Sequence, residues 1–245
     1  MLNLDLSIFW QEVLEGDGVL WMDMLYSGLL WTLATSALAG MIAFGVGSLM
    51  GVLRTTPNKG LVFLGNAYVE LFRNIPLIVQ FFIWYFVLPE FIPPLKSWVI
   101  AQDPTEVQFL TAVVCLGLFT AARVAEQVKS GILALSRGQR AAAYALGLTE
   151  VQTYRYVLLP MAYRIVIPPL TSEAMNLFKN TSVALTIGLV ELTFRTREMG
   201  EVTFRFLEAY IAATVLYVAV AMTVNRIMAL IERRVAVPGY IAGGK

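Results

Sequence analysis

The dominant pattern along the chain is a series of long apolar stretches separated by short polar segments. A bilayer core of about 30 Å needs roughly 20 mostly apolar residues in helical form. Five stretches meet this requirement, at about 25–53, 61–88, 107–135, 165–190 and 209–231. Some exceed the minimum length, which indicates tilted helices or helices that continue beyond the lipid. The pattern predicts an all-α polytopic membrane protein, with a single domain over residues 1–245 and five transmembrane helices.

Small residues and prolines within these stretches predict where helices pack closely and where they bend. Gly47 and Gly51 in the first stretch form a GxxxG pair, which lets a second helix approach closely. Pro76 lies in the second stretch, and the pair Pro168 and Pro169 lies in the fourth. Because a proline leaves a backbone carbonyl without its helical donor, we expect kinks that face the protein interior.

The charges that flank the stretches predict the orientation of the chain. Residues 1–24 contain no Lys or Arg and five Asp or Glu, whereas 136–164 holds four Arg against one Glu. Counted over alternate sides, ten basic residues stand on one side and four on the other. Cytoplasmic loops carry the excess of Lys and Arg, so we expect the N-terminus outside and the C-terminus in the cytoplasm. An odd number of spans agrees with ends on opposite sides.

Composition supports the membrane assignment and removes most catalytic chemistry. The chain is 58% hydrophobic and 14% charged, against about 25% charged residues in soluble domains. It has no histidine and one cysteine, Cys115, so disulfides, zinc sites and His-dependent catalysis are excluded. No basic block indicates nucleic acid. The first residues lack a basic n-region, so the first apolar stretch is expected to stay in the mature protein.

The segment 137–160, between the third and fourth stretches, carries the most specific local pattern. A run of alanines favours a short helix, and Gly147 suits the left-handed position that ends one. Thr149 followed by Gln152 forms a capping box that opens a second helix. Pro160 is expected to close this segment before the chain returns to the membrane. The segment therefore predicts a cytoplasmic helical hairpin whose small alanine face fits a groove of a partner protein.

This spacing resembles the EAA loop of ABC importer permeases. That loop is written Glu-Ala-Ala, three residues, Gly, nine residues, an aliphatic residue, one residue and Leu-Pro. The matching positions here are Ala141, Ala142, Ala143, Gly147, Val157, Leu159 and Pro160. Ala141 stands where the family usually has Glu. The resemblance implies that the hairpin is the coupling helix that docks on an ATP-binding subunit.

The resemblance covers almost the whole chain and extends to one subfamily. VELFRNIPLIVQFF at 69–82 is similar to the ExFRxxPxxxQ signature of polar amino-acid permeases. GLFTAARVAEQVKSGILALSRGQ, FKNTSVALTIGLVEL and the RRVAVPG ending also resemble that subfamily. The nearest likeness is to the permease subunits of bacterial glutamate/aspartate transport systems.

The resemblance implies a subunit of the bacterial cytoplasmic (inner) membrane that has no ATPase site of its own. The sequence contains no Walker A pattern, so ATP and Mg²⁺ would be held by a pair of cytoplasmic ATP-binding subunits. The other implied partners are an extracytoplasmic substrate-binding protein and a second permease, a related but distinct chain. A homodimer of permeases is the alternative.

Two other readings of the function stay open at this stage. One is a permease for another polar amino acid. The other is a secondary transporter that works without ATP, although such proteins usually carry internal repeats, and none is evident here. An intramembrane enzyme is disfavoured, because the spans hold no histidine and no pair of aspartates.

Polar residues on three of the predicted helices form stripes that could line a common hydrated pathway. Charged groups inside a membrane are costly and therefore need partners or water. The candidate pathway residues are Glu70, Arg73, Gln80, Arg123, Glu126, Glu173, Asn176, Lys179, Asn180 and Ser182. The alternative is structural, with Glu70–Arg73 and Arg123–Glu126 as i,i+3 ion pairs that hold helix register.

Arg123 and Lys179 are the cations at expected mid-membrane depth. An acidic substrate has one carboxylate more than a neutral amino acid, and these cations suit that group. In the absence of substrate, we expect Glu126 to neutralise Arg123 and Glu173 to neutralise Lys179, because each is close in sequence.

Overall fold

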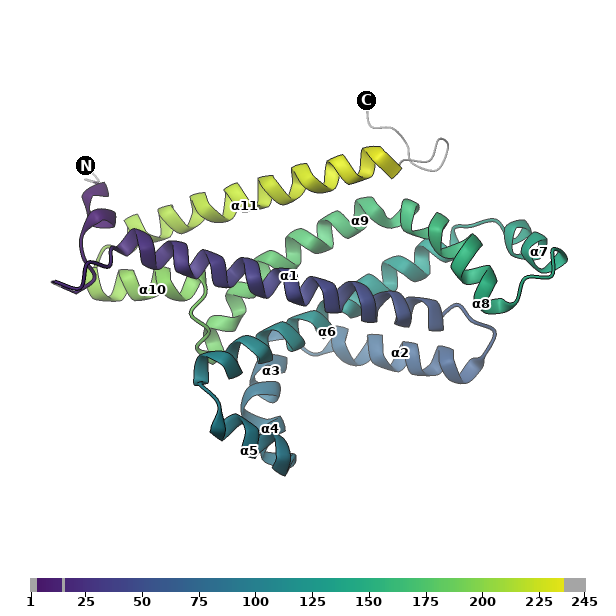
Figure 1. The fold of residues 1–245 in the computed structure, drawn as a ribbon, viewed down its shortest axis with the longest axis horizontal. Helices are drawn as coiled ribbons and strands as arrows, with labels where there is room; N and C mark the ends of the chain where they lie inside the picture. The colour runs from purple at the N-terminus through teal and green to yellow at the C-terminus, as the bar shows by residue number, and fades with distance from the viewer. Residues whose placement is uncertain (1–3, 15, 236–245) are drawn as a thin grey trace. The chain divides into compact units, whose positions relative to one another are not determined.

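The computed structural model describes residues 4–14 and 16–235, and within these ranges every extended regular element is a helix (Figure 1). Glu15, Lys245 and the end of the RRVAVPG motif from residue 236 lie outside the described residues. The α-helices are α1 (Trp21–Leu53), α2 (Lys59–Asn74), α3 (Leu77–Phe82), α4 (Leu88–Phe91), α5 (Pro93–Ala101), α6 (Pro104–Leu133), α7 (Arg137–Ala145), α8 (Glu150–Thr153), α9 (Leu159–Asn180), α10 (Leu192–Thr203) and α11 (Phe206–Val235).

The chain divides into two compact units, and the four longest helices contribute a part to each. Unit 1 comprises residues 1–40, 76–117 and 176–222, and unit 2 comprises 41–75, 118–175 and 223–245. Within unit 1, the first part of α1 packs with α10 and the start of α11 around the fully buried Leu25. One cluster of unit 2 lies between the last part of α1 and the parts of α6 and α9 that belong to this unit, and a smaller one joins α2 to α6.

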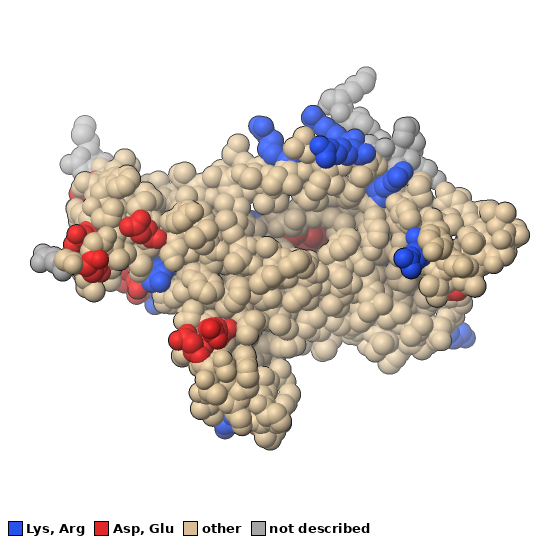
Figure 2. All heavy atoms as spheres, in the orientation of Figure 1, with Lys and Arg blue, Asp and Glu red and all other residues tan. Residues whose placement is uncertain are grey.

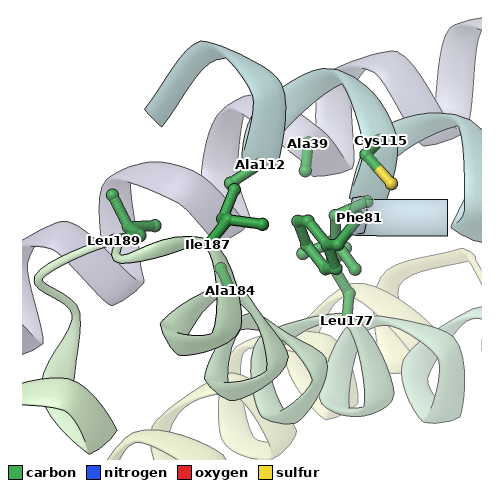
Figure 3. Close-up of a cluster of buried hydrophobic side chains, with 9 residues drawn as sticks. Ala39, Phe81, Ala112, Cys115, Leu177, Ala184, Ile187 and Leu189 are labelled. Carbon is green, nitrogen blue, oxygen red and sulfur yellow. The ribbon is translucent and has the colours of Figure 1, made fainter. Parts of the chain in front are cut away.

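A second cluster in unit 1 joins α1, α3, α6 and the segment after α9 (Figure 3). Phe81 of α3 is completely buried at its centre, against Ala39, Cys115 and Leu177. Ile187 and Leu189 close the cluster from the other side. Between membrane helices, where lipid is as apolar as the side chains, such a cluster stabilises the packing mainly through close van der Waals contact.

The GxxxG pair in α1 brings that helix into close contact with α6 inside unit 2. A Cβ atom placed on Gly47 would lie 2.6 Å from Cβ of Val124, and one on Gly51 would lie 2.7 Å from Cβ of Val128. Both distances are too short for any side chain, so only glycine permits this approach. The predicted close-packing role of the pair is confirmed for this contact within the chain.

The second predicted span is broken rather than straight. Helix α2 ends at Asn74 and α3 begins at Leu77, so the helical run is interrupted at Ile75–Pro76. Pro76 has no N–H and pushes the preceding residue out of the helical region, and Ile75 is indeed extended at φ −96° and ψ 125°. The predicted kink at Pro76 is therefore confirmed, and the apolar stretch 61–88 is divided between α2 and the helical pieces that follow it.

The fourth predicted span ends earlier than expected. Helix α9 stops at Asn180 and a 3-10 helix follows over Thr181–Ile187. Gly188 ends this run. Its φ of +89° is left-handed, a conformation that glycine adopts without steric cost. The α-helical part of the fourth stretch therefore ends at Asn180, and the rest of the stretch continues as a 3-10 helix to Ile187. Pro168 and Pro169 lie inside α9, which continues past them.

The predicted hairpin is present and is formed by the predicted local signals. Gly147 has φ +80°, and Leu148 N–H donates to the carbonyl of Ala143 over 3.1 Å, as in a Schellman motif. The Thr149 side chain accepts from Gln152 N–H, and the Gln152 side chain accepts from Thr149 N–H, which completes the capping box. In Figure 1, α7 and α8 project from the other helices of unit 2.

Pro160 does not end the second helix of the hairpin, contrary to expectation. Residues 150–180 form one helical run, in which a π-helical turn, Tyr154–Leu158, joins α8 to α9. Leu159 N–H bonds to the carbonyl of Tyr154, five residues back. The wider turn accommodates a proline that cannot donate to the carbonyl four residues before it. Unit 1 shows the same arrangement, with a π-helical turn over Ile83–Val87 directly before Leu88 and Pro89.

Candidate functional site

A charged pocket of about 440 Å³ opens in unit 2 among the segments of α2, α6 and α9. Its lining is almost entirely polar and comprises Arg73, Phe119, Arg123, Glu126, Gln127 and Glu173. The lining includes four of the predicted pathway residues, one from α2, two from α6 and one from α9. The polar stripes of these three helices therefore do meet.

Glu126 is held by two arginines from other parts of unit 2. Its Oε1 lies 3.0 Å from Nη2 of Arg54 and 3.0 Å from Nη1 of Arg73. The Arg54 side chain is only 7% exposed and also donates from Nε to Oδ1 of Asn66 over 2.8 Å. A buried guanidinium needs such partners, since an unpaired charge away from water is strongly destabilising. The expected i,i+3 pairing of Glu126 with Arg123 is therefore wrong.

Arg123 instead approaches a carboxylate from α9. Its Nη1 lies 3.9 Å from Oε2 of Glu173, and its guanidinium lies 5.3 Å from the ring centre of Phe119. At 3.9 Å the two charges attract without a hydrogen bond, and Oε2 of Glu173 is buried with no hydrogen-bond partner among the described residues. The Arg123 side chain is 42% exposed. The pair therefore leaves guanidinium N–H groups free to bind another carboxylate.

The remaining candidate residues do not line this pocket. Glu70 is exposed on α2 and forms no ion pair with Arg73 in the part of the chain that the structure describes, so the second predicted i,i+3 pair is also wrong. Arg73 forms its ion pair with Glu126 instead. Because Arg73 and Glu126 lie on different helices, their contact depends on packing that sequence spacing does not reveal.

Five candidates lie in unit 1. Gln80 of α3 is buried, Asn176 and Asn180 are half-buried, and Lys179 is exposed. Ser182 donates its hydroxyl to the carbonyl of Lys179 over 2.7 Å, a local helix-end contact. Within unit 1, Lys179 has no ion pair among the described residues. The expected neutralisation of Lys179 by Glu173 is wrong, because the carboxylate of Glu173 faces Arg123.

Sequence reasoning missed Arg54, which it counted only as a cytoplasmic charge. The signal that could have identified it is Gly65 on α2, where a Cβ would lie 2.5 Å from Cγ of Arg54. A glycine opposite the end of a helix leaves room for a long side chain to enter the bundle. Arg54 is therefore part of the polar network of the pocket.

A second missed residue is Glu191, which is completely buried in unit 1. Its side chain caps α10 by accepting from Phe194 N–H over 2.8 Å, and it also accepts from the hydroxyl of Tyr217 over 3.1 Å. Its position three residues before that N–H is the usual spacing of an N-cap. These contacts assign it a role in helix capping.

The hairpin presents part of its predicted coupling surface to solvent. Ala141, Ala142 and Gly147 are exposed, and a Cβ on Gly147 would meet no atom within 4 Å. Ala143 is buried, so it packs inside the hairpin. Leu159 is half-buried and Pro160 is exposed in the helical run that follows.

Two large apolar side chains stand beside these small residues. Leu146 is 81% exposed and Val151 is 74% exposed, one on each side of the turn. The hydroxyl of Tyr144 donates to the carboxylate of Glu150, and this hydrogen bond raises the pKa of Tyr144 above its usual range. An exposed apolar tip held rigid by caps is typical of a surface that another protein covers.

Three described helices, α1, α6 and α11, are long and apolar enough to cross a bilayer, and the bent pair of α2 with α3–α4 adds a possible fourth span. In the same residues no group of three or more Asp, Glu, His or Cys side chains could hold a metal ion. The fold and the charged pocket therefore define a helical, multi-spanning membrane protein.

Residues 43–237 match the family described as the inner membrane component of binding-protein-dependent transport systems, and the chain belongs to that family. The predicted family of ABC importer permeases is thereby confirmed.

Individual similar proteins agree with this assignment. The glutamate/aspartate import permease protein GltJ of Escherichia coli (strain K12) is 48% identical over 239 residues, which cover 97% of each chain. GltK, a glutamate/aspartate import permease protein of E. coli O157:H7, is 29% identical over 215 residues, which cover 88% of this chain and 95% of GltK. Among solved structures, an amino acid ABC transporter crystallised with histidines has a TM-score of 0.72 and 28% identity, over 87% of this chain and 95% of that one.

Proposed function

We propose that the chain is a permease subunit of an ATP-driven importer for acidic amino acids, glutamate and aspartate. The observation that carries the proposal is the 48% identity with GltJ over 97% of both chains. The subunit has no catalytic site of its own, and ATP with Mg²⁺ is bound by partner subunits. The chain forms a single permease domain in the inner membrane of a bacterium.

The charge of the pocket supports an acidic substrate. Around it, three arginines, Arg54, Arg73 and Arg123, oppose the two carboxylates of Glu126 and Glu173, which leaves a surplus of one positive charge. A substrate with an additional carboxylate balances this surplus. Arg123 is the group best placed to bind it, because its contact with Glu173 is long and its guanidinium can bind a carboxylate through two N–H groups.

The test is uptake by the complete transporter reconstituted in vesicles. Wild type is expected to import glutamate and aspartate faster than glutamine, and only with ATP. In Arg123→Gln, uptake of glutamate is expected to fall at least about tenfold, as for loss of a charge-assisted hydrogen bond, while uptake of glutamine changes little. Lys179→Gln tests the second cation in the same way.

A matched control is Arg197→Gln on α10, since Arg197 is 56% exposed and, among the described residues, its ion pair is with Glu201, one turn away. This variant is expected to transport as wild type does. If wild type prefers glutamine, the substrate is another polar amino acid. If an ion gradient replaces ATP, the chain works as a secondary transporter and the proposal fails.

We further propose five membrane spans, formed by α1, the bent pair of α2 with α3–α4, α6, α9 and α11, with the N-terminus outside and the C-terminus in the cytoplasm. The distribution of charge supports this orientation. In Figure 2, mostly acidic side chains gather around the N-terminal segment and α10 of unit 1. In unit 2, basic side chains lie over the last part of α11 and near the hairpin.

This topology can be tested with single cysteines. The natural Cys115 is completely buried and is first replaced by alanine. A cysteine at the exposed Leu4 is expected to react with a membrane-impermeant thiol reagent added to intact cells. One at the exposed Gly138 is expected to react only after the membrane is opened. The reverse labelling pattern would overturn both the orientation and the cytoplasmic position of the hairpin.

The partners follow from this arrangement. The hairpin docks on one of a pair of cytoplasmic ATP-binding subunits through Ala141, Ala142 and Gly147, next to the exposed Leu146 and Val151. An extracytoplasmic substrate-binding protein delivers the amino acid from outside. The second permease is a related but distinct chain, an arrangement supported by similarity to both GltJ and GltK.

A further inference from the structure

The hydroxyl group of Tyr154 connects the hairpin to the end of α1 within unit 2. Tyr154 opens the π-helical turn, and its side chain is 5% exposed in a cluster with Leu135 and Leu158. Its hydroxyl lies 3.0 Å from Oγ1 of Thr55 and 3.0 Å from Nη2 of Arg140. Thr55 is the second residue after α1, and Arg140 belongs to the first helix of the hairpin.

The directions of these hydrogen bonds follow from the groups that take part. The Thr55 hydroxyl donates to the carbonyl of Val52 over 2.9 Å, so it accepts from Tyr154. Arg140 can only donate, so Tyr154 accepts from it. One continuous series of hydrogen bonds therefore runs from α7 through Tyr154 to the last turn of α1.

The aromatic ring and the hydroxyl make different contributions to this link. The Arg140 guanidinium lies 5.3 Å from the centre of the Tyr154 ring, within the range of a cation–π contact. This contact and the burial of the ring survive removal of the hydroxyl. Contact with Thr55, by contrast, depends on the hydroxyl alone.

The residue before Thr55 leads to the charged pocket. Arg54 bonds to Glu126, and Glu126 bonds to Arg73, which lines the pocket. The two consecutive residues that follow α1 therefore face in two directions: Thr55 contacts the hairpin and Arg54 contacts the network of the pocket. A displacement of the hairpin that moves Thr55 also moves Arg54.

We infer that Tyr154 is a positioning residue for coupling, which transmits movement of the hairpin to the end of α1 and from there to the charged pocket. The inference rests on the proposed function of the hairpin as the docking element for the ATPase. Without the hydroxyl the hairpin still docks, because its exposed Ala142 face is unchanged. Its movement then reaches α1 less completely, and ATP is hydrolysed without a corresponding import of substrate.

The test compares ATP hydrolysis with import in the complete transporter, using whichever of glutamate, aspartate or glutamine wild type carries fastest. Tyr154→Phe is expected to raise the number of ATP molecules hydrolysed per molecule imported about two- to tenfold, the range set by loss of one hydrogen bond. Attachment of the ATPase and thermal stability are expected to stay near wild type. Thr55→Val removes the same contact from the other side and is expected to give the same result.

The double variant decides whether the two residues act through one contact. Tyr154→Phe with Thr55→Val is expected to show no larger effect than either single change. The inference would be overturned if the increase in the double variant were the product of the two single increases. It would also be overturned if Tyr154→Phe hydrolysed as much ATP per imported molecule as wild type does. If Tyr154→Phe fails to assemble, Thr55→Val decides alone, and a wild-type ratio there overturns the inference equally.

Tyr156→Phe is the matched control. Tyr156 lies two residues further along the same turn but is 63% exposed, so loss of its hydroxyl is expected to leave the ratio unchanged. Failure of the proposed function is seen separately, with Ala142→Glu. If that variant still binds the ATPase and imports substrate, the hairpin is not the docking element, whatever the Tyr154 variants show.

Discussion

The Gly47→Leu variant is expected to lose the packing of α1 against α6, and folded protein in the membrane should fall at least about tenfold. A Cβ at this position would lie 2.6 Å from Cβ of Val124 and 2.8 Å from the carbonyl oxygen of Ala121. Backbone cannot move aside as a flexible side chain can, and leucine adds three further carbons. Overpacking of this kind costs about 3 kcal/mol. The measurement is the yield of monodisperse protein in detergent and its thermal midpoint.

Gly45→Leu provides the control on the same helix. It lies two residues from Gly47, and a Cβ there would meet no atom within 4 Å. The substitution has the same size and the same effect on helix propensity, so it is expected to leave yield and midpoint near wild type. Equal losses in both variants would show that leucine disturbs α1 itself rather than its contact with α6.

The Ala142→Glu variant is expected to abolish import while the chain remains folded. Ala142 is exposed on α7, so the carboxylate meets water in the free subunit and folding is preserved. If the hairpin docks in a groove of the ATPase as proposed, the same carboxylate has to lose its water without a partner, which is strongly unfavourable. Co-purification of the ATPase and ATP-dependent uptake measure the effect. Ala142→Ser, which changes size and charge little, is expected to keep both.

The spans formed by α1, α6 and α11 could be predicted because continuous apolar runs imply helices of sufficient length. The second and fourth runs contain more polar and charged residues, and α9 is not among the described helices that are apolar enough to cross a bilayer alone. Pro76 indicated a kink, but the size of a bend depends on what the two helical pieces pack against, here Phe81 in a buried cluster. The 3-10 helix Thr181–Ile187 contains no proline or glycine that would predict a change of helix type.

For the charged pocket, helical periodicity correctly grouped Arg73, Arg123, Glu126 and Glu173, but sequence spacing assigned the wrong partners. Residues three apart on one helix are always near each other, so local pairs are the default assumption. Contacts between helices compete with these local pairs. The buried Arg54 pairs with Glu126 in place of the more exposed Arg123, because no water can replace a lost partner of Arg54. Such choices depend on helix packing, which one sequence does not reveal.

The hairpin was the most predictable part of the molecule, since its signals are local. Gly147 and the Thr149–Gln152 capping box each determine the backbone within one turn, and both appear as expected. Only Pro160 was misjudged, because the rule that proline ends a helix assumes an α-helical turn before it.

The π-helical turn before Pro160 also governs the direction in which the hairpin leaves α9. Such a turn holds one residue more than an α-helical turn, and each residue of an α-helix advances about 100° around the axis. Side-chain faces before Tyr154 and after Leu158 are therefore out of phase by about that angle. If residues 150–180 were treated as one regular α-helix, the buried and exposed faces of either α8 or α9 would be assigned wrongly. The direction in which the side chains of the hairpin point, relative to those of α9, is thus determined by the additional residue in the turn Tyr154–Leu158 rather than by the side chains of that turn.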